Sequence, residues 1–210
     1  MALEQNKYTH LVELGGSDYE IVDGEPDIRG WDVKNRSGIK IGEIDELLFN
    51  PDSLKVRYMV VDVDKNELNI EQKKILVPIG TAVLYNDGRL QDNDVNEERN
   101  TIDADERMER NEQIGTQSYV ERTTYNPSDD GKVVVVPITA EHISWLPAYE
   151  RDNLNPHTEV ATRRAFLGLN DPNYRIDESE YSAEEFYNHE HFNEEKFYNT
   201  RTRSNLKRKL

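Results

Sequence analysis

The clearest strand in this sequence is Lys55-Val-Arg-Tyr-Met-Val-Val-Asp-Val63. Its β-branched and aromatic residues are the types that pack well on a pleated surface. Strict alternation divides its apolar side chains between two faces. One face receives Val56, Tyr58 and Val60, and the other receives Met59, Val61 and Val63. Because both faces are apolar, we expect a strand that is central to a barrel or covered on both sides.

Shorter strands are predicted on either side of this one. Upstream, residues 31–33 and the alternating Ile39 and Ile41 flank the turn residues Asn35-Arg-Ser-Gly38 and form a hairpin pattern, and residues 42–49 continue from it. The turn Asn50-Pro-Asp-Ser53 then leads into the central strand. Downstream, strands are expected at 75–79, 82–85 and 132–138. The sequence is therefore predicted to be mainly β.

A polar stretch separates the last two of these strands. Residues 88–131 contain 12 acidic and 5 basic residues and almost no apolar ones, which indicates a long solvated insertion. Loop length costs little entropy, so the strands at each end of such an insertion remain free to pair. We therefore expect the strands at 82–85 and 132–138 to be neighbours in the sheet.

Two helices are predicted after the last strand. Thr139 is a suitable N-cap for a helix over 140–146, which Pro147 ends. Asn155-Pro156 gives a second start signal, and Gly168 gives the matching stop. The apolar side of this second helix is expected to consist of Val160, Ala161, Ala165 and Leu167.

Composition excludes several classes of protein. The chain has 210 residues, a formal net charge of −16 and no Cys, so disulfides, iron–sulfur clusters, thiolate nucleophiles and Cys-ligated zinc are excluded. Neither a secretory signal pattern nor an apolar run of membrane-spanning length is present. Such an acidic surface repels phosphate backbones and anionic lipids. We therefore expect a cytoplasmic protein without membrane insertion and without general nucleic-acid binding.

Several blocks of this sequence resemble the PRC-barrel domain. In order, they are Asp27-Ile-Arg-Gly-Trp-Asp-Val33, Gly38-Ile-Lys-Ile-Gly-Glu-Ile-Asp-Glu-Leu-Leu-Phe49, Val56-Arg-Tyr-Met-Val-Val-Asp62 and Ile75-Leu-Val-Pro-Ile-Gly80. Residues 133–149 are similar to the closing strand and following helix of members that are like the H subunit. The family is named after the cytoplasmic part of the H subunit of purple bacterial photosynthetic reaction centres. It also includes a ribosome maturation factor and stand-alone bacterial proteins.

This resemblance implies a small β-barrel that acts as a docking platform. The relatives bind large protein or ribonucleoprotein partners and have no catalytic residues to transfer. We therefore divide the chain into an N-terminal extension (1–18), a PRC-barrel domain (19–168) and an acidic, aromatic tail (169–210) with a basic end. The domain carries the insertion at about 88–131 and short helices after about 139. Composition leaves open whether the insertion and the tail are ordered.

The tail contains a repeated aromatic pattern. Glu185-Phe-Tyr-Asn188 recurs as Lys196-Phe-Tyr-Asn199 with Phe192 between them, and Ser182 forms a capping-box pattern with Glu185. Eleven residues are close to three helical turns, so both Phe-Tyr pairs are expected on nearly the same helix face. The interaction candidates are Phe186, Tyr187, Phe192, Phe197 and Tyr198. Two interpretations stay open: the tail folds on a protein partner, or it packs back on its own barrel.

The basic end of the tail supplies a second set of interaction candidates. They are Arg201, Arg203, Lys207, Arg208 and Lys209. Such residues could contact an anionic partner, the acidic insertion of another molecule, or RNA. With so few charges the binding would be weak and sensitive to salt.

No pattern in the sequence predicts catalysis or a cofactor. An activated nucleophile, a Gly-rich phosphate loop and a zinc-protease helix are all missing. The stretch Asp92-Asn-Asp-Val-Asn-Glu97 begins like a calcium loop, but Glu97 and Asp103 stand where Gly and Glu are needed. His189-Glu-His191 lies in a polar tail and lacks groups to orient its rings. We predict no catalytic, cofactor-binding or metal-binding residues, and we expect Trp31 and Tyr58 in the barrel core.

The leading functional hypothesis is a non-enzymatic interaction or scaffold module, with self-association as one form of it. The first alternative is a barrel that binds a small ligand or a metal. The second is a role like that of the H subunit in the photosynthetic light reaction and its electron transfer, which the family resemblance implies. The partner and the cellular process stay open, because fold does not imply function.

Overall fold

The structure is a computed structural model that describes residues 10–63, 70–86, 89–90, 130–151, 154–169, 181–194, 197 and 206–209. In these ranges the strands are β1 (Val12–Glu13), β2 (Tyr19–Ile21), β3 (Asp32–Asn35), β4 (Lys40–Asn50), β5 (Lys55–Asp62), β6 (Lys74–Pro78), β7 (Val83–Asn86), β8 (Arg89–Leu90), β9 (Lys132–Val136) and β10 (Leu206–Arg208). The α helices are α2 (Ala140–Trp145), α3 (Pro156–Phe166) and α4 (Ala183–Tyr187). The short 3-10 helices are η1 (Ile79–Thr81) and η5 (Glu190–Phe192).

The main sheet follows the order β6-β5-β4-β3-β9-β7-β8, and β1 pairs with the far end of β4. The predicted hairpin is confirmed as the antiparallel pair β3–β4, and the predicted neighbours are confirmed as the antiparallel pair β7–β9. The parallel pair β3–β9 was not anticipated from the sequence. The mainly β class is confirmed, whereas the described ladders leave β6 and β8 unjoined, so a closed barrel stays a prediction.

Two irregularities shape the pairing of β4 with β5. The register shifts once between Ile44 and Glu46 and again between Leu48 and Phe49. At the second shift Leu48 faces Tyr58 and Phe49 faces Val56, so Arg57 is an extra residue in the ladder. A bulge of this kind reverses the alternation of side chains beyond it. The predicted grouping of Val56 with Tyr58 and Val60 is therefore wrong, because Val56 lies on the opposite face.

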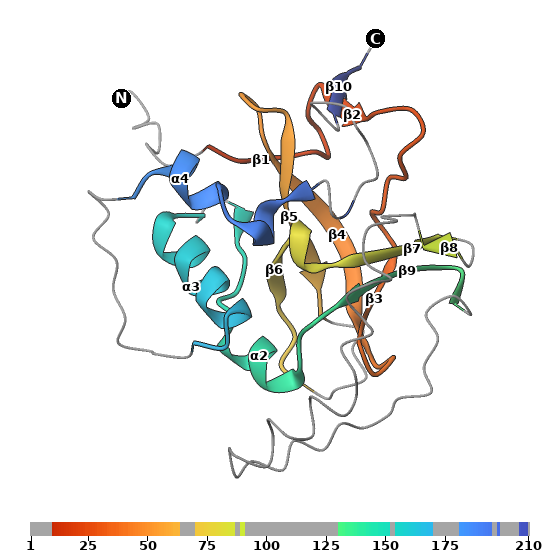
Figure 1. The fold of residues 1–210 in the computed structure, drawn as a ribbon, viewed down its shortest axis with the longest axis vertical. Helices are drawn as coiled ribbons and strands as arrows, with labels where there is room; N and C mark the ends of the chain where they lie inside the picture. Colours follow the sequence, from red (N-terminus) through yellow and green to blue (C-terminus); the bar gives the residue numbers. More distant parts are fainter. Residues whose placement is uncertain are drawn as a thin grey trace, which may run out of the picture.

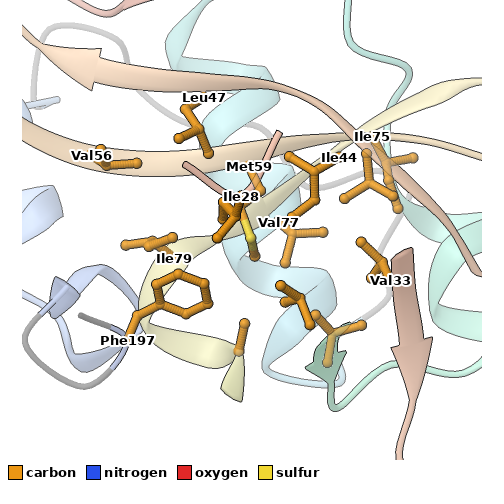
Figure 2. Close-up of a cluster of buried hydrophobic side chains, with 14 of the residues drawn as sticks. Ile28, Val33, Ile44, Leu47, Val56, Met59, Ile75, Val77, Ile79 and Phe197 are labelled. Atoms are coloured by element: carbon orange, nitrogen blue, oxygen red, sulfur yellow. The ribbon is translucent and has the colours of Figure 1, made fainter. Parts of the chain in front are cut away.

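Both faces of β5 are covered, as the sequence predicts. One face contributes to the inner cluster, in which Val56, Met59 and Val61 pack with residues of β3, β4, β6, β7 and β9 (Figure 2). The other face contributes to the outer cluster. Its buried members are Leu11, Leu48, Tyr58, Val60, Leu76, Tyr149, Leu154, Val160, Phe186, Tyr187 and Phe192. Tyr58 is thus buried as expected, although in the outer cluster, and Trp31 is only partly buried against the inner one.

The helices begin where the sequence predicts. Thr139 caps α2, and Asn155 caps α3 with Pro156 in the first turn. Figure 1 shows α3 running beside β6. The predicted apolar side of α3 is only partly right, because Ala161 and Leu167 are exposed. The buried residues of α3 are Pro156, Glu159, Val160, Thr162 and Ala165.

The tail has regular structure in residues 181–194 and 206–209, but not as one helix. Ser182 accepts a hydrogen bond from the Glu185 N–H as the capping pattern predicts, and α4 then ends at Tyr187. A break and η5 follow, so Phe186 and Tyr187 enter the outer cluster whereas Phe197 enters the inner one. The prediction of one shared helical face is therefore wrong. No helix in the described ranges has both the length and the apolar character needed to cross a membrane.

Some predicted features lie outside the described residues. They are most of the insertion at 88–131, including Asp92–Glu97, and the tail residues Tyr198, Arg201 and Arg203. Predictions about them remain predictions.

Candidate functional site

The C-terminal segment, residues 181–194 and 197, lies against the sheet and α3. Figure 1 shows α4 near the first turn of α3 and near β1. The sequence left open whether the tail folds on a partner or packs on its own barrel domain. In the structure the aromatic residues of the segment pack on their own chain. We call the part of the fold beneath this segment the docking surface: residues 55–58 of β5, η1, and the face of α3 with Glu159 and Arg163.

Three aromatic side chains of the segment enter the outer cluster. Phe192 is 1% exposed, and its ring centroid lies 5.0 Å from that of Tyr187 and 5.2 Å from that of Tyr58. Phe186 completes the group, 5.2 Å from Phe192 between centroids. Edge-on and tilted aromatic pairs at these spacings are favourable beyond their buried area. These candidates are therefore anchors within this chain rather than exposed contacts.

Phe197 is buried on the opposite side, in the inner cluster. It is 2% exposed, and Figure 2 shows its ring beside Ile79 of η1. The segment thus contacts both clusters, and η1 lies between its two sets of anchors.

Gly80 of η1 allows the backbone of the segment to approach closely. A Cβ placed on Gly80 would lie 2.6 Å from the Glu190 carbonyl oxygen and 2.8 Å from both the N and the O of Asn193. Those atoms are backbone, so they cannot swing away as a flexible side chain could. Gly80 has no positive φ, so a side chain there would conflict with the docked segment and not with its own backbone conformation.

Two arginine side chains of the docking surface each contact one aromatic ring and one backbone carbonyl of the segment. The Arg163 guanidinium lies 4.3 Å from the Phe186 ring centroid and donates to the Phe186 carbonyl at 3.5 Å. The Arg57 guanidinium lies 4.8 Å from the Tyr187 centroid and donates to the Phe192 carbonyl at 3.3 Å. Burial lowers the pKa of Arg57, although an arginine stays charged. The bulge in β5 is what places Arg57 here.

Glu194 fixes the end of η5 to β5. Its carboxylate accepts from the Val56 N–H at 3.0 Å and lies 3.5 Å from the Lys55 ammonium. Burial raises the pKa of Glu194, against the effect of Lys55 and Arg57. An acidic side chain of the segment is therefore matched to a basic edge of the docking surface.

The buried carboxylate of Glu159 on α3 contacts the side chains of His10, Tyr181 and Tyr187. Glu159 is fully buried and accepts from the Tyr187 hydroxyl and, at 2.7 Å, from the Tyr181 hydroxyl. His10 Nε2 lies 3.0 Å from the same carboxylate and 2.8 Å from the Tyr187 hydroxyl. Burial first, and the Glu159 charge second, raise the pKa values of Tyr58, Tyr181 and Tyr187 far above that of an ordinary phenol. These tyrosines therefore stay protonated over the physiological range, and Tyr181 and Tyr187 donate to Glu159.

Sequence reasoning missed Glu159, His10, Tyr181 and Gly80. A Glu in the first turn of a capped helix usually faces solvent, and no local pattern marked this one as buried. In the structure Glu159 is nevertheless buried, as are Val160 and Thr162 of the same helix.

An open cleft of about 1270 Å³ lies beside the segment. It is bounded by the β4–β5 turn on one side and by α4 and η5 on the other. His10, Lys55 and Arg57 line it together with acidic residues such as Asp52 and Glu184. Its mixed charge offers hydrogen bonds to a polar ligand without selecting one sign of charge.

The His189–His191 pair is close, with ring centroids 4.5 Å apart, and His189 Nδ1 accepts from the His191 N–H at 3.2 Å. Within the part of the chain that the structure describes, no group of three or more His, Asp or Glu residues is placed to hold a metal ion.

The basic end of the tail contacts the chain's own acidic residues. β10 pairs antiparallel with β2, and Leu206 is buried opposite Ile21. Lys207 lies 2.6 Å from the Asp23 carboxylate, and Lys209 donates to the Asp18 and Ser17 carbonyls. Arg208 lies 4.0 Å from the Asp18 carboxylate. In this structure Lys207 and Arg208 thus meet acidic residues in and beside β2, whereas Lys209 meets backbone carbonyls.

A search of curated proteins found no match to this chain. The model of one family, the PRC-barrel domain, matches residues 24–107. The match begins before β3, includes β4 to β8, and extends into the polar stretch that the sequence analysis treats as an insertion. It ends before β9, so the helices and the C-terminal segment lie outside it. The matched residues include the sequence blocks from Asp27 to Gly80 on which the resemblance was noted, and residues 24–107 of the chain are a PRC-barrel domain.

Proposed function

We propose that this protein is a non-enzymatic interaction module, in which the PRC-barrel domain holds peptide segments on the outer face of β5 and on η1. The observation that carries the proposal is the way in which the C-terminal segment lies on Gly80, where its backbone comes closer than any Cβ would allow. Close backbone approach, aromatic anchors and arginines on carbonyls are features of a surface that binds an extended or partly helical peptide. A cytoplasmic location remains a prediction from the sequence.

The outer face of β5 is suited to binding because it is apolar and belongs to the outer cluster, not to the inner one. Without the segment, the ring of Tyr58 would lose its contacts with Tyr187 and Phe192, and the outer cluster would lose three buried aromatic rings. An exposed apolar face of that kind marks an interaction site. The segment therefore acts as a resident ligand that a partner would have to displace.

Three full-length proteins test this proposal by affinity capture from lysate of the native host. They are the wild type, the double variant Phe186→Ala/Tyr187→Ala, and the same double variant with Gly80→Ala added. The double variant weakens the resident segment and should capture more of a specific partner than the wild type does. The added Gly80→Ala leaves the segment weakened but blocks the approach of any other backbone, so the gain should disappear.

Equal capture by all three proteins would contradict the proposal. Capture that rises in the double variant and stays high with Gly80→Ala would place binding elsewhere on the chain. The folded state of each variant is checked by circular dichroism before capture.

The runner-up function is binding of a small polar ligand in the open cleft, which its volume and its His10, Lys55 and Arg57 side chains favour. Calorimetric titration of the full chain with calcium, zinc, manganese and inorganic phosphate tests it. Heats that vanish in Arg57→Ala would support this function, and flat titrations with all four would reject it for these ligands. The role like that of the reaction-centre H subunit remains a prediction from the family resemblance.

A further inference from the structure

The C-terminal segment contacts β5, η1 and α3 through side chains and backbone atoms that a second copy of the chain also has. Its anchors meet β5 and η1, and its acidic and carbonyl groups meet Val56, Arg57 and Arg163. None of these contacts depends on the segment belonging to the same molecule. A second copy would present the same side chains and the same backbone.

Charge contributes to the fit at one point, because the Glu194 carboxylate lies 3.5 Å from the Lys55 ammonium. The docking surface contributes Lys55, Arg57 and Arg163, three cations in a chain whose formal net charge is −16. The segment contributes the acidic residues Glu184, Glu185, Glu190 and Glu194. Complementary charge of this kind favours an acidic peptide and rejects a basic one. The peptide that fits this surface is therefore acidic and aromatic, with a carboxylate two residues after its last outer anchor, as Glu194 follows Phe192.

We propose that the protein self-associates by exchange, in which the C-terminal segment of one copy docks on the docking surface of a second copy. This inference rests on the proposed function and names its partner. The segment of a second copy carries every feature on which the cis contact depends: the anchors Phe186, Tyr187 and Phe192, the Glu194 carboxylate, and a backbone that fits over Gly80. Exchange of an identical element between copies needs no new interface and is a low-cost route to a dimer.

Two full-length variants test the exchange when they are mixed. Gly80→Ala blocks the docking surface but leaves an intact segment that is free to dock elsewhere. Phe186→Ala/Tyr187→Ala disables the segment but leaves an intact and uncovered docking surface. Each variant alone should stay at the 24.5 kDa mass of one chain, and the mixture should give a 1:1 complex of twice that mass in native mass spectrometry and light scattering.

A mixture that contains only the two separate masses, although both variants are folded, would overturn the proposal. A mixture of the double variant with a chain that carries both sets of substitutions is the matched control, and it should give no complex. If the double variant does not fold, Glu194→Lys replaces it, because reversing this charge weakens the segment without removing an aromatic anchor. A failed mixture together with the predicted lysate capture would reject self-exchange but leave the proposed function standing, whereas failure of both would reject the docking surface itself.

Discussion

The C-terminal segment and β10 belong to the same end of the chain, yet they are held by different kinds of contact. The segment is held by buried groups: Phe192 is 1% exposed, and the carboxylates of Glu159 and Glu194 are 0% and 4% exposed. β10 is held largely at the surface, where the side chain of Asp23 is 91% exposed and that of Asp18 is 82% exposed. Leu206 is the exception, since it is buried in the inner cluster.

The two kinds of contact should therefore respond differently to mutation and to salt. A buried contact is strong because water cannot replace it, so removing one partner leaves the other unpaired. An exposed ion pair contributes little, because water and salt compete for both charges. We therefore expect mutations beneath the segment to have large effects that salt does not change. Mutations in β10 should have small effects that salt does change.

The largest effect is expected for Phe192→Ala. This change removes a buried ring that lies against Tyr58, Phe186 and Tyr187. We expect the free energy of unfolding to fall by about 3–5 kcal/mol, as for other buried Phe→Ala changes. Chemical denaturation followed by circular dichroism measures it. Phe192→Leu is the control and should lose much less, and a loss below about 1 kcal/mol in Phe192→Ala would contradict this packing.

A smaller loss is expected for Glu159→Gln. The amide keeps the shape of the side chain but not the charge, so the hydrogen bonds from Tyr181 and Tyr187 become weaker. Hydrogen bonds to a charged group contribute about 1.5–3 kcal/mol, and we expect part of that to be lost. Denaturation at neutral pH measures the change, with Glu141→Gln as the matched control. Glu141 lies exposed in the first turn of α2, so its change should stay within about 0.5 kcal/mol. Equal effects at both positions would contradict the buried role of Glu159.

The sequence predicted those elements whose signals are local. The strand at β5 and the caps Thr139 and Asn155 follow from residue types over short stretches. The antiparallel pairing of β7 with β9 was predicted because the two strands flank the polar insertion directly. The parallel pairing of β3 with β9 joins segments that no turn connects, so no local pattern could predict it. The bulge at Arg57 is also set by the partner strand, and it moved Val56 to the other face.

For the site, the sequence identified the right aromatic residues but the wrong environment. Phe186, Tyr187, Phe192 and Phe197 were singled out by their repeat, and the repeat suggested one continuous helix. The structure divides them between two clusters, because η1 and Gly80 lie between the two sets. Glu159 was missed because its three partners are His10, Tyr181 and Tyr187. None of them lies within one or two helical turns of Glu159, so no local spacing pattern links them to it.

The contribution of Glu194 to stability is expected to depend on pH. Burial raises its pKa in the folded protein above the value of 4.5 in the unfolded chain, so the folded state holds this proton more tightly. The stabilisation from this group is therefore complete below pH 4.5 and is lost as the pH rises through the raised pKa. In Glu194→Gln this dependence disappears.

Denaturation of the wild type and Glu194→Gln at several pH values between 4 and 7 measures this contribution. The free energy of unfolding of the variant minus that of the wild type should increase as the pH rises and then level off. A difference that decreases with pH would mean that Lys55 and Arg57, and not burial, dominate at Glu194.

The smallest effect is expected in β10, and salt should reveal it. Lys207 lies 2.6 Å from Asp23 and 3.6 Å from Glu20, and both carboxylates are well exposed. Raising the salt concentration toward 1 M shortens the screening length to about 3 Å, so these pairs weaken while the buried contacts of the segment do not. Hydrogen exchange should therefore show faster exchange in residues 206–208 at high salt, with no change in residues 183–187.

Lys207→Ala separates the charged contribution of β10 from the apolar one. The variant should exchange faster than the wild type at low salt and should lose most of the salt dependence, because the main ion pairs are gone. What protection remains should come from Leu206, which stays buried opposite Ile21 in the β2–β10 ladder. If the variant keeps the full salt dependence, the charges that matter lie on other residues. If residues 183–187 respond to salt as strongly as β10 does, burial does not distinguish the two regions in the way argued above.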